Sequence, residues 1–116
     1  MAVFEVDSTI KSSAAAAFDG MADARNEPKW NTQVSRSTLL SDEPVGDGSR
    51  FETVNRGQTY KATITTYERP ERLAFTVAGK SIDITATFAF SETDGSTRNH
   101  ATFDFRPKGV SNSSSR

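Results

Sequence analysis

The sequence feature that most constrains the fold is a pair of strongly alternating segments, residues 81–90 and 97–106. Each segment places apolar side chains, many of them isoleucine or phenylalanine, at every second position. A period of two with such residues indicates half-buried strands, and the Asp94-Gly95 pair between them is typical of a hairpin turn. The sequence therefore predicts a hairpin with one continuous apolar face, and whatever covers that face determines the function.

Other alternating segments predict the rest of the sheet. Further strands are expected at residues 3–10, 34–40, 50–55, 59–67 and 73–77. Gly57-Gln58 is expected to form the tight turn between the third and fourth of these, because glycine tolerates a positive φ. Together with the hairpin, these segments predict an antiparallel sheet of about six or seven strands.

Two short helices are expected between the first strand and the second. Ser12-Ser13 supplies an N-cap for a helix over residues 14 to about 23, which carries an apolar face at helical spacing. A very short second helix is expected at residues 26–30, with Asn26 as its cap. The fold class is therefore α+β, a meander of strands with two short N-terminal helices.

Composition excludes several classes of function. The chain has 116 residues, which suits one domain, and its formal net charge of −1 with scattered cations argues against nucleic-acid binding. It has no cysteine and one histidine, so we expect no thiol chemistry and no Cys-based or His-rich metal site. We also expect no metal site of another kind and no cofactor. No apolar run approaches the roughly 20 residues of a membrane span, and residues 1–10 alternate like a strand rather than a signal peptide. A cytoplasmic protein is expected.

Several short segments together resemble one known superfamily. They are Phe4-Glu5-Val6 with Ile10, Ala16-Ala17-Phe18-Asp19, Pro28-Lys29-Trp30, the stretch Val45 to Phe51, the stretch Glu68 to Phe75, and Phe88-Ala89-Phe90 followed by Asp94 to Arg98. In this order and spacing they resemble the SRPBCC superfamily, the START-like or helix-grip proteins. Within it, the chain is most similar to the polyketide cyclase/dehydrase and lipid-transport group, over roughly residues 3–109.

The resemblance implies a curved antiparallel sheet that grips a long C-terminal helix, with a hydrophobic ligand cavity between them. Here the sequence departs from the family, because residues 106–110 resemble the lead-in to that helix but residues 111–116 cannot form it. We therefore expect residues 1–109 to form a C-terminally truncated START-like domain that lacks the long helix. The polar, low-complexity residues 110–116 are expected to be a disordered tail.

An uncovered sheet face would be costly. Five or six large apolar side chains at about 1.5–3 kcal/mol each sum to order 10 kcal/mol of lost burial. This rivals the roughly 5–15 kcal/mol that stabilises a whole domain. We therefore expect either a marginal monomer or a homodimer that covers the open sheet face.

The residues expected to bind a ligand lie mainly at the alternating strand positions that carry apolar side chains. They are Trp30, Phe51, Tyr60, Ile64, Phe75, Val77, Ile84, Phe88, Ala101 and Phe103. These side chains are expected to set the shape of the cavity and to exclude water from the ligand. Trp30 either packs the short helix on the sheet or lines a cavity mouth, and Tyr60 either presents its hydroxyl to a ligand or is a core tyrosine.

No catalytic residue can be assigned from the sequence. His100, Asp83 and Asp104 fall on the polar parity of their strands, which favours solvated surface residues over a general base or a carboxylate pair. Gly46-Asp47-Gly48 lacks the residues that would make it a phosphate-binding loop.

The first hypothesis for function is binding of a small hydrophobic ligand, such as a lipid, a polyketide or an aromatic-like molecule, in a cavity on the concave sheet face. The second is a polyketide cyclase or dehydratase type of enzyme, which would hold a reactive chain in a folded orientation. The third is a protein-interaction module that uses the exposed sheet face.

Overall fold

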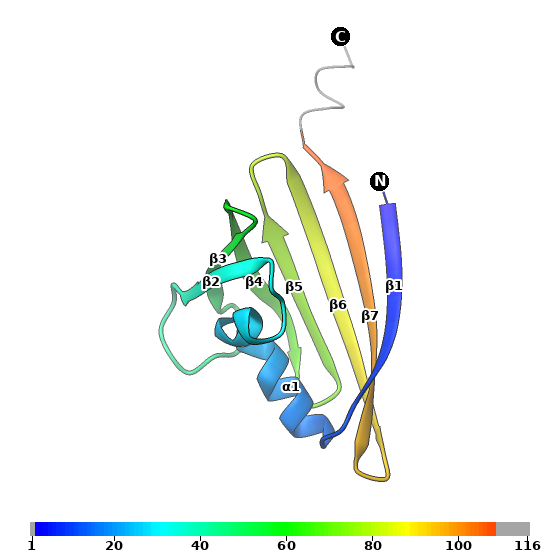
Figure 1. Cartoon of the computed structure of the whole chain (residues 1–116). Coiled ribbons are helices and arrows are strands. Elements are labelled where there is room, and N and C mark those ends of the chain that lie inside the picture. Colours follow the sequence, from blue (N-terminus) through cyan, green and yellow to red (C-terminus); the bar gives the residue numbers. More distant parts are fainter. Residues whose placement is uncertain (1, 109–116) are drawn as a thin grey trace.

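The computed structural model describes residues 2–108, which form a seven-stranded antiparallel sheet with one α-helix and one 3-10 helix packed on it (Figure 1). The strands are β1 (Ala2–Ile10), β2 (Val34–Leu39), β3 (Arg50–Asn55), β4 (Gln58–Glu68), β5 (Arg72–Ala78), β6 (Ile82–Thr93) and β7 (Ser96–Pro107). The helices are α1 (Ala14–Ala22) and η1 (Ala24–Lys29). The strand order is β1-β7-β6-β5-β4-β3-β2. The expected α+β class is confirmed.

No long helix follows β7 within residues 2–108. The predicted disordered tail, residues 110–116, lies outside the described residues. In the described part of the chain, no helix is long and apolar enough to cross a membrane.

The central hairpin has the predicted turn. Strands β6 and β7 pair without interruption, from Ile82 opposite Pro107 to Thr93 opposite Ser96. The turn residues Asp94 and Gly95 have φ values of 52° and 79°. Two consecutive positive φ values match the twist of the flanking strands, which is why Asp-Gly is favoured there.

The turn between β3 and β4 differs from the prediction by one residue. Arg56 and Gly57 have the positive φ values, 51° and 79°, whereas Gln58 already belongs to β4. The prediction of Gly57-Gln58 was therefore wrong. The two-residue loop sets Asn55 opposite Gln58, and glycine takes the second loop position.

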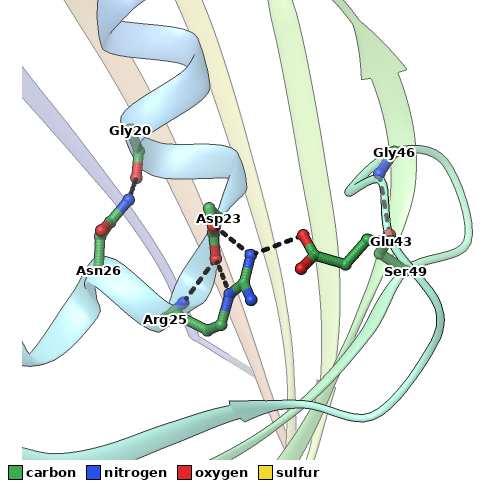
Figure 2. Close-up of polar contacts among 7 residues, drawn as sticks. All are labelled: Gly20, Asp23, Arg25, Asn26, Glu43, Gly46 and Ser49. Atoms are coloured by element: carbon green, nitrogen blue, oxygen red, sulfur yellow. Dashed lines mark hydrogen bonds and ion pairs between the residues drawn. The ribbon is translucent and has the colours of Figure 1, made fainter.

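The two helices are joined by an aspartate that ends one and caps the other. Ser13 caps α1 as predicted, and its hydroxyl accepts a hydrogen bond of 3.1 Å from the Ala16 amide. The cap of η1 is Asp23, whose carboxylate accepts from the Arg25 amide at 3.1 Å. The predicted cap, Asn26, is wrong, because its side chain instead donates back to the Gly20 carbonyl (Figure 2).

The core lies between α1 and one end of the sheet. Phe18 is fully buried, and its ring meets those of Tyr67 and Phe90 at centroid distances of 5.0 and 5.9 Å. Small residues on the same helix face, such as Ala14 and Ala17, are also buried and let the helix approach closely. Figure 1 shows α1 across one end of the sheet, while the other ends of β6, β7 and β1 carry no helix.

Candidate functional site

We call the sheet face on which α1 packs the inner face, and its chemistry follows from strand register. The residues that lie side by side in three rows across the strands are Phe51, Ala62, Val77, Ile84 and Phe105; Ile64, Phe75, Ala86, Phe103 and Phe4; and Leu73, Phe88, Ala101 and Val6. Because opposite residues in a sheet point to the same side, these rows form one apolar surface.

Burial divides the predicted ligand-binding residues into two groups. Those near α1 or in the sheet centre are buried, namely Phe51, Ile64, Phe75, Phe88 and Ala101. Those toward the other end are half-buried, namely Tyr60, Val77, Ile84 and Phe103. On the adjoining strand β1, Phe4 is 57% exposed and Val6 is 50% exposed. We call Val77, Ile84, Phe103, Phe105, Phe4 and Val6 the open patch.

Aromatic rings connect the core to the open patch. From Phe88, ring contacts lead to Phe103 at 5.9 Å and from there to Phe105 at 6.5 Å. Phe105 then meets Phe4 edge-on at 5.5 Å. Edge-to-face pairs of this kind hold rings in defined positions. The open patch is therefore an ordered continuation of the core.

Tyr60 and Trp30 occupy different surroundings. Tyr60 is half-buried on β4, and its ring lies against Gly79, where a β-carbon would come within 2.6 Å of the ring carbon Cε2. The glycine therefore makes room for the ring. Trp30 follows η1 as its C-cap residue and is 59% exposed, so it is not a buried anchor.

Neither of two hollows in the described part of the chain encloses the open patch. One, of about 350 Å³, lies along β5, β6 and β7, where Val77 and Ile84 line it together with Asp83 and Arg106. The other, of about 230 Å³, lies between α1, η1 and the loop before β3. Neither hollow brings the predicted ligand residues together in an enclosed cavity.

An ion-pair chain borders the smaller hollow. Figure 2 shows the Arg25 guanidinium between two carboxylates, 2.8 Å from Asp23 and 3.1 Å from Glu43. These bonds lower the pKa of Asp23 and raise that of Arg25. The one guanidinium balances only one of the two carboxylates, and the three groups together join the loop before β3 to the helices.

The outer face carries His100 and its acidic partners, as strand alternation predicts. His100 lies opposite Asp7, with its Nδ1 2.9 Å from that carboxylate and its Nε2 3.0 Å from Glu5. The hydrogen bond to Asp7 is the main cause that raises the pKa of His100, and it lowers the pKa of Asp7. Asp83 and Asp104 lie on the outer face as predicted, where Lys108 and Arg106 pair with them. Both are half-buried rather than fully solvated, and the Oδ1 atom of each is buried without a hydrogen-bond partner among the described residues.

The fold and the apolar inner face can now be compared with known proteins. A family model described as "Polyketide cyclase / dehydrase and lipid transport" matches residues 1–115. The chain belongs to this family. The resemblance stated from the sequence is thereby confirmed. In a search of curated protein sequences, nothing matches this chain.

Solved structures share the family's fold at low sequence identity. A START superfamily protein from Mycobacterium smegmatis has a TM-score of 0.77 at 15% identity, over 93% of this chain and 79% of that one. Ara h 8.0201 has a TM-score of 0.72 at 16% identity, over 94% and 79%. CalU16 from Micromonospora echinospora has a TM-score of 0.65 at 14% identity, over 87% and 59%. Identities this low establish the fold alone.

Sequence reasoning left three residues of the open patch out of the predicted site. Phe4 pairs with Phe103 and Val6 pairs with Ala101. Phe105 follows Phe103 on the same face of β7 and lies opposite Ile84. The alternation of residues 3–10 already placed Phe4 and Val6 on one face of a strand. For these two residues, the missing information was which strand neighbours the hairpin, since β1 and β7 are far apart in the sequence. Phe105 already shared the apolar positions of the hairpin with Phe103 and was left out without such a reason.

Proposed function

We propose that this member of the polyketide cyclase/dehydrase and lipid transport family binds a small hydrophobic ligand on the open patch. The observation that carries the proposal is the apolar inner face that continues from the core past α1 and ends in the exposed Phe4 and Val6. Isolated exposed apolar residues are common, whereas a contiguous patch ordered by ring contacts is typical of an interaction site.

The predicted ligand residues have separate tasks in this proposal. The buried rings of Phe75 and Phe88 form the floor that holds the patch in shape, and they are 6.4 Å apart. The half-buried Ile84 and Phe103 would contact the ligand, and each buried methylene group would contribute about 0.8 kcal/mol. Tyr60 offers a hydroxyl at the edge of this surface, where it could orient a polar group of the ligand.

The open patch suits binding better than acid–base catalysis. The imidazole of His100 and the carboxylate of Asp7 lie on the outer face, bonded to each other at 2.9 Å. In the described part of the chain, no carboxylate or imidazole belongs to the three apolar rows of the inner face. A face-to-face homodimer would use the same apolar atoms as a ligand, so the two would compete for the patch.

Two residues on β1 provide a matched test. Phe4 and Val3 are 57% and 56% exposed, but Phe4 belongs to the inner face and Val3 to the outer face. The fluorescent apolar probe anilinonaphthalene sulfonate is titrated into the wild type, Phe4→Ser and Val3→Ser, with near-ultraviolet circular dichroism to establish that each variant is folded.

The proposal predicts saturable probe binding that Phe4→Ser weakens and Val3→Ser leaves unchanged. If the folded wild type does not bind the probe, or if both serine variants weaken binding equally, the open patch is not the binding surface.

A further inference from the structure

Little buried surface holds β1 in the sheet. The strand order puts it at one edge, next to β7. Every residue from Ala2 to Thr9 is exposed, whereas Ile10, the last residue of the strand, packs against the core. Elements with few buried contacts are the ones that open locally while the rest of a protein stays folded. Polar contacts between β1 and β7 therefore matter for keeping β1 in place.

One imidazole of β7 lies between two carboxylates of β1 on the outer face. Nδ1 of His100 is 2.9 Å from the Asp7 carboxylate, and Nε2 is 3.0 Å from the Glu5 carboxylate. A neutral imidazole has a proton on one nitrogen and a lone pair on the other, whereas the imidazolium has a proton on both. Both nitrogens can therefore attract their carboxylates only in the charged form. In the neutral form, one of the two contacts sets a lone pair against a negatively charged oxygen, which is repulsive.

The other cation near these carboxylates does not replace the imidazolium. Arg98 of β7 is 3.5 Å from Asp7, and its charge does not change near neutral pH. Among the described residues, the ion pair of Glu5 is the one with His100. Loss of the ring proton therefore leaves Asp7 with one cation and Glu5 with none.

β6, on the other side of the ring, brings no titratable group to the adjoining outer-face positions. The residue opposite His100 and the two that flank it on that face are Ala89, Thr87 and Ser91. One strand further, Arg72 of β5 lies opposite Ala89 and pairs with Glu68 at 4.0 Å. The protonation of the ring is therefore linked mainly to the carboxylates of β1.

We propose that His100 is a pH-sensitive latch, which holds β1 on β7 when the imidazole is protonated and lets β1 open more often when it is neutral. The contacts with Asp7 and Glu5 raise the pKa of His100 above 6.5. The latch is therefore fully present below about pH 6.5 and is lost as the pH rises through the folded-state pKa. Acid strong enough to protonate carboxylates releases it as well.

Opening of β1 changes the inner face too. Phe4 and Val6 belong to the open patch, where they lie opposite Phe103 and Ala101. They alternate along β1 with the two residues that contact His100, so the same opening carries them away from the patch. The latch thus sets how often the β1 part of the open patch is missing. It concerns the strand itself and does not depend on ligand binding.

The test measures amide exchange with water in β1, with β4 as the reference strand. Rates are divided by the intrinsic rates at each pH to give protection factors. We expect β1 to be less protected than β4 in the wild type, because β1 opens locally. Protection of β1 should fall by about two- to fivefold between about pH 6 and about pH 9, the range expected when an exposed ion pair is lost.

Three variants separate the latch from other effects of pH. His100→Gln should show the lower protection of β1 at both pH values. His100→Lys keeps a cation at both pH values and should show higher protection than His100→Gln, without the pH-dependent fall. Arg98→Gln is the matched control, which removes a cation that does not titrate in this range, so it should keep the pH-dependent fall. Near-ultraviolet circular dichroism establishes that each variant is folded.

Three outcomes would overturn the proposal. One is protection of β1 as high as that of β4, which would show that β1 opens only when the whole domain unfolds. Another is protection of β1 in the wild type that does not change between the two pH values. The third is a fall in His100→Gln or in His100→Lys as large as that in the wild type, which would assign the pH dependence to another group.

Discussion

Truncating one phenylalanine in the core and one on the open patch should have very different effects on stability. Phe18, on α1, is fully buried against the sheet, so Phe18→Ala removes the whole side chain from the core and leaves a cavity, at a cost of about 3–5 kcal/mol. Phe4 is 57% exposed, so less than half of the roughly 1.5–3 kcal/mol available from full burial is gained there. We therefore expect Phe4→Ala to lower the free energy of unfolding by about 1 kcal/mol. This figure includes the loss of the edge-on contact between Phe4 and Phe105.

Equilibrium unfolding in urea measures the difference in stability loss between the two variants. With a slope of about 1.5 kcal/mol per molar urea, Phe18→Ala should lower the midpoint by roughly 2–3 M and Phe4→Ala by less than about 1 M. The experiment is done at the lowest protein concentration that gives a signal, so that self-association does not contribute. If Phe4→Ala costs as much as Phe18→Ala, the open patch is covered in solution and our description of it as a free surface is wrong.

Two further variants test the outer face and the helix start. The contacts with Asp7 and Glu5 raise the pKa of His100 above its ordinary 6.5, so their stabilisation is present below pH 6.5 and lost as the pH rises through the folded-state pKa. His100→Gln should therefore lower the urea midpoint at about pH 6 and leave it nearly unchanged at about pH 9, and an equal effect at both pH values would contradict this assignment. Ser13→Ala removes the acceptor for the Ala16 amide and should cost about 1 kcal/mol by thermal unfolding, while no measurable loss would show that the cap is dispensable.

Local patterns in the sequence were sufficient to predict most of the elements. Alternation around Asp94-Gly95 gave the hairpin, and Ser13 gave the start of α1, because both signals depend on residues close together in the chain. The two local errors have a local cause as well. Asn26 is a suitable helix cap, but Asp23 lies at the position where η1 begins. Gln58 is a suitable turn residue, but the turn is made by Arg56 and Gly57.

The shape of the candidate site could not be predicted in the same way. Which predicted ligand residues are buried depends on where α1 lies across the sheet. Phe88 and Phe103 occupy equivalent positions in the alternating pattern, but Phe88 is buried and Phe103 is half-buried. The neighbourhood of Phe4 and Phe105 depends on pairing between the first and last strands. Such non-local contacts are set by topology, which alternation alone does not specify.

The most direct test of the central claim compares methyl groups on the two faces of the same strand. Val6 and Val3 are similarly exposed on β1, at 50% and 56%, but they point to the inner and outer faces. Methyl NMR spectra are recorded while anilinonaphthalene sulfonate is added to the wild-type chain. Our account predicts saturable shifts for Val6 and for Ile84, with Val3 unchanged. Shifts of Val3 as large as those of Val6, or no saturable shift at Ile84, would contradict it.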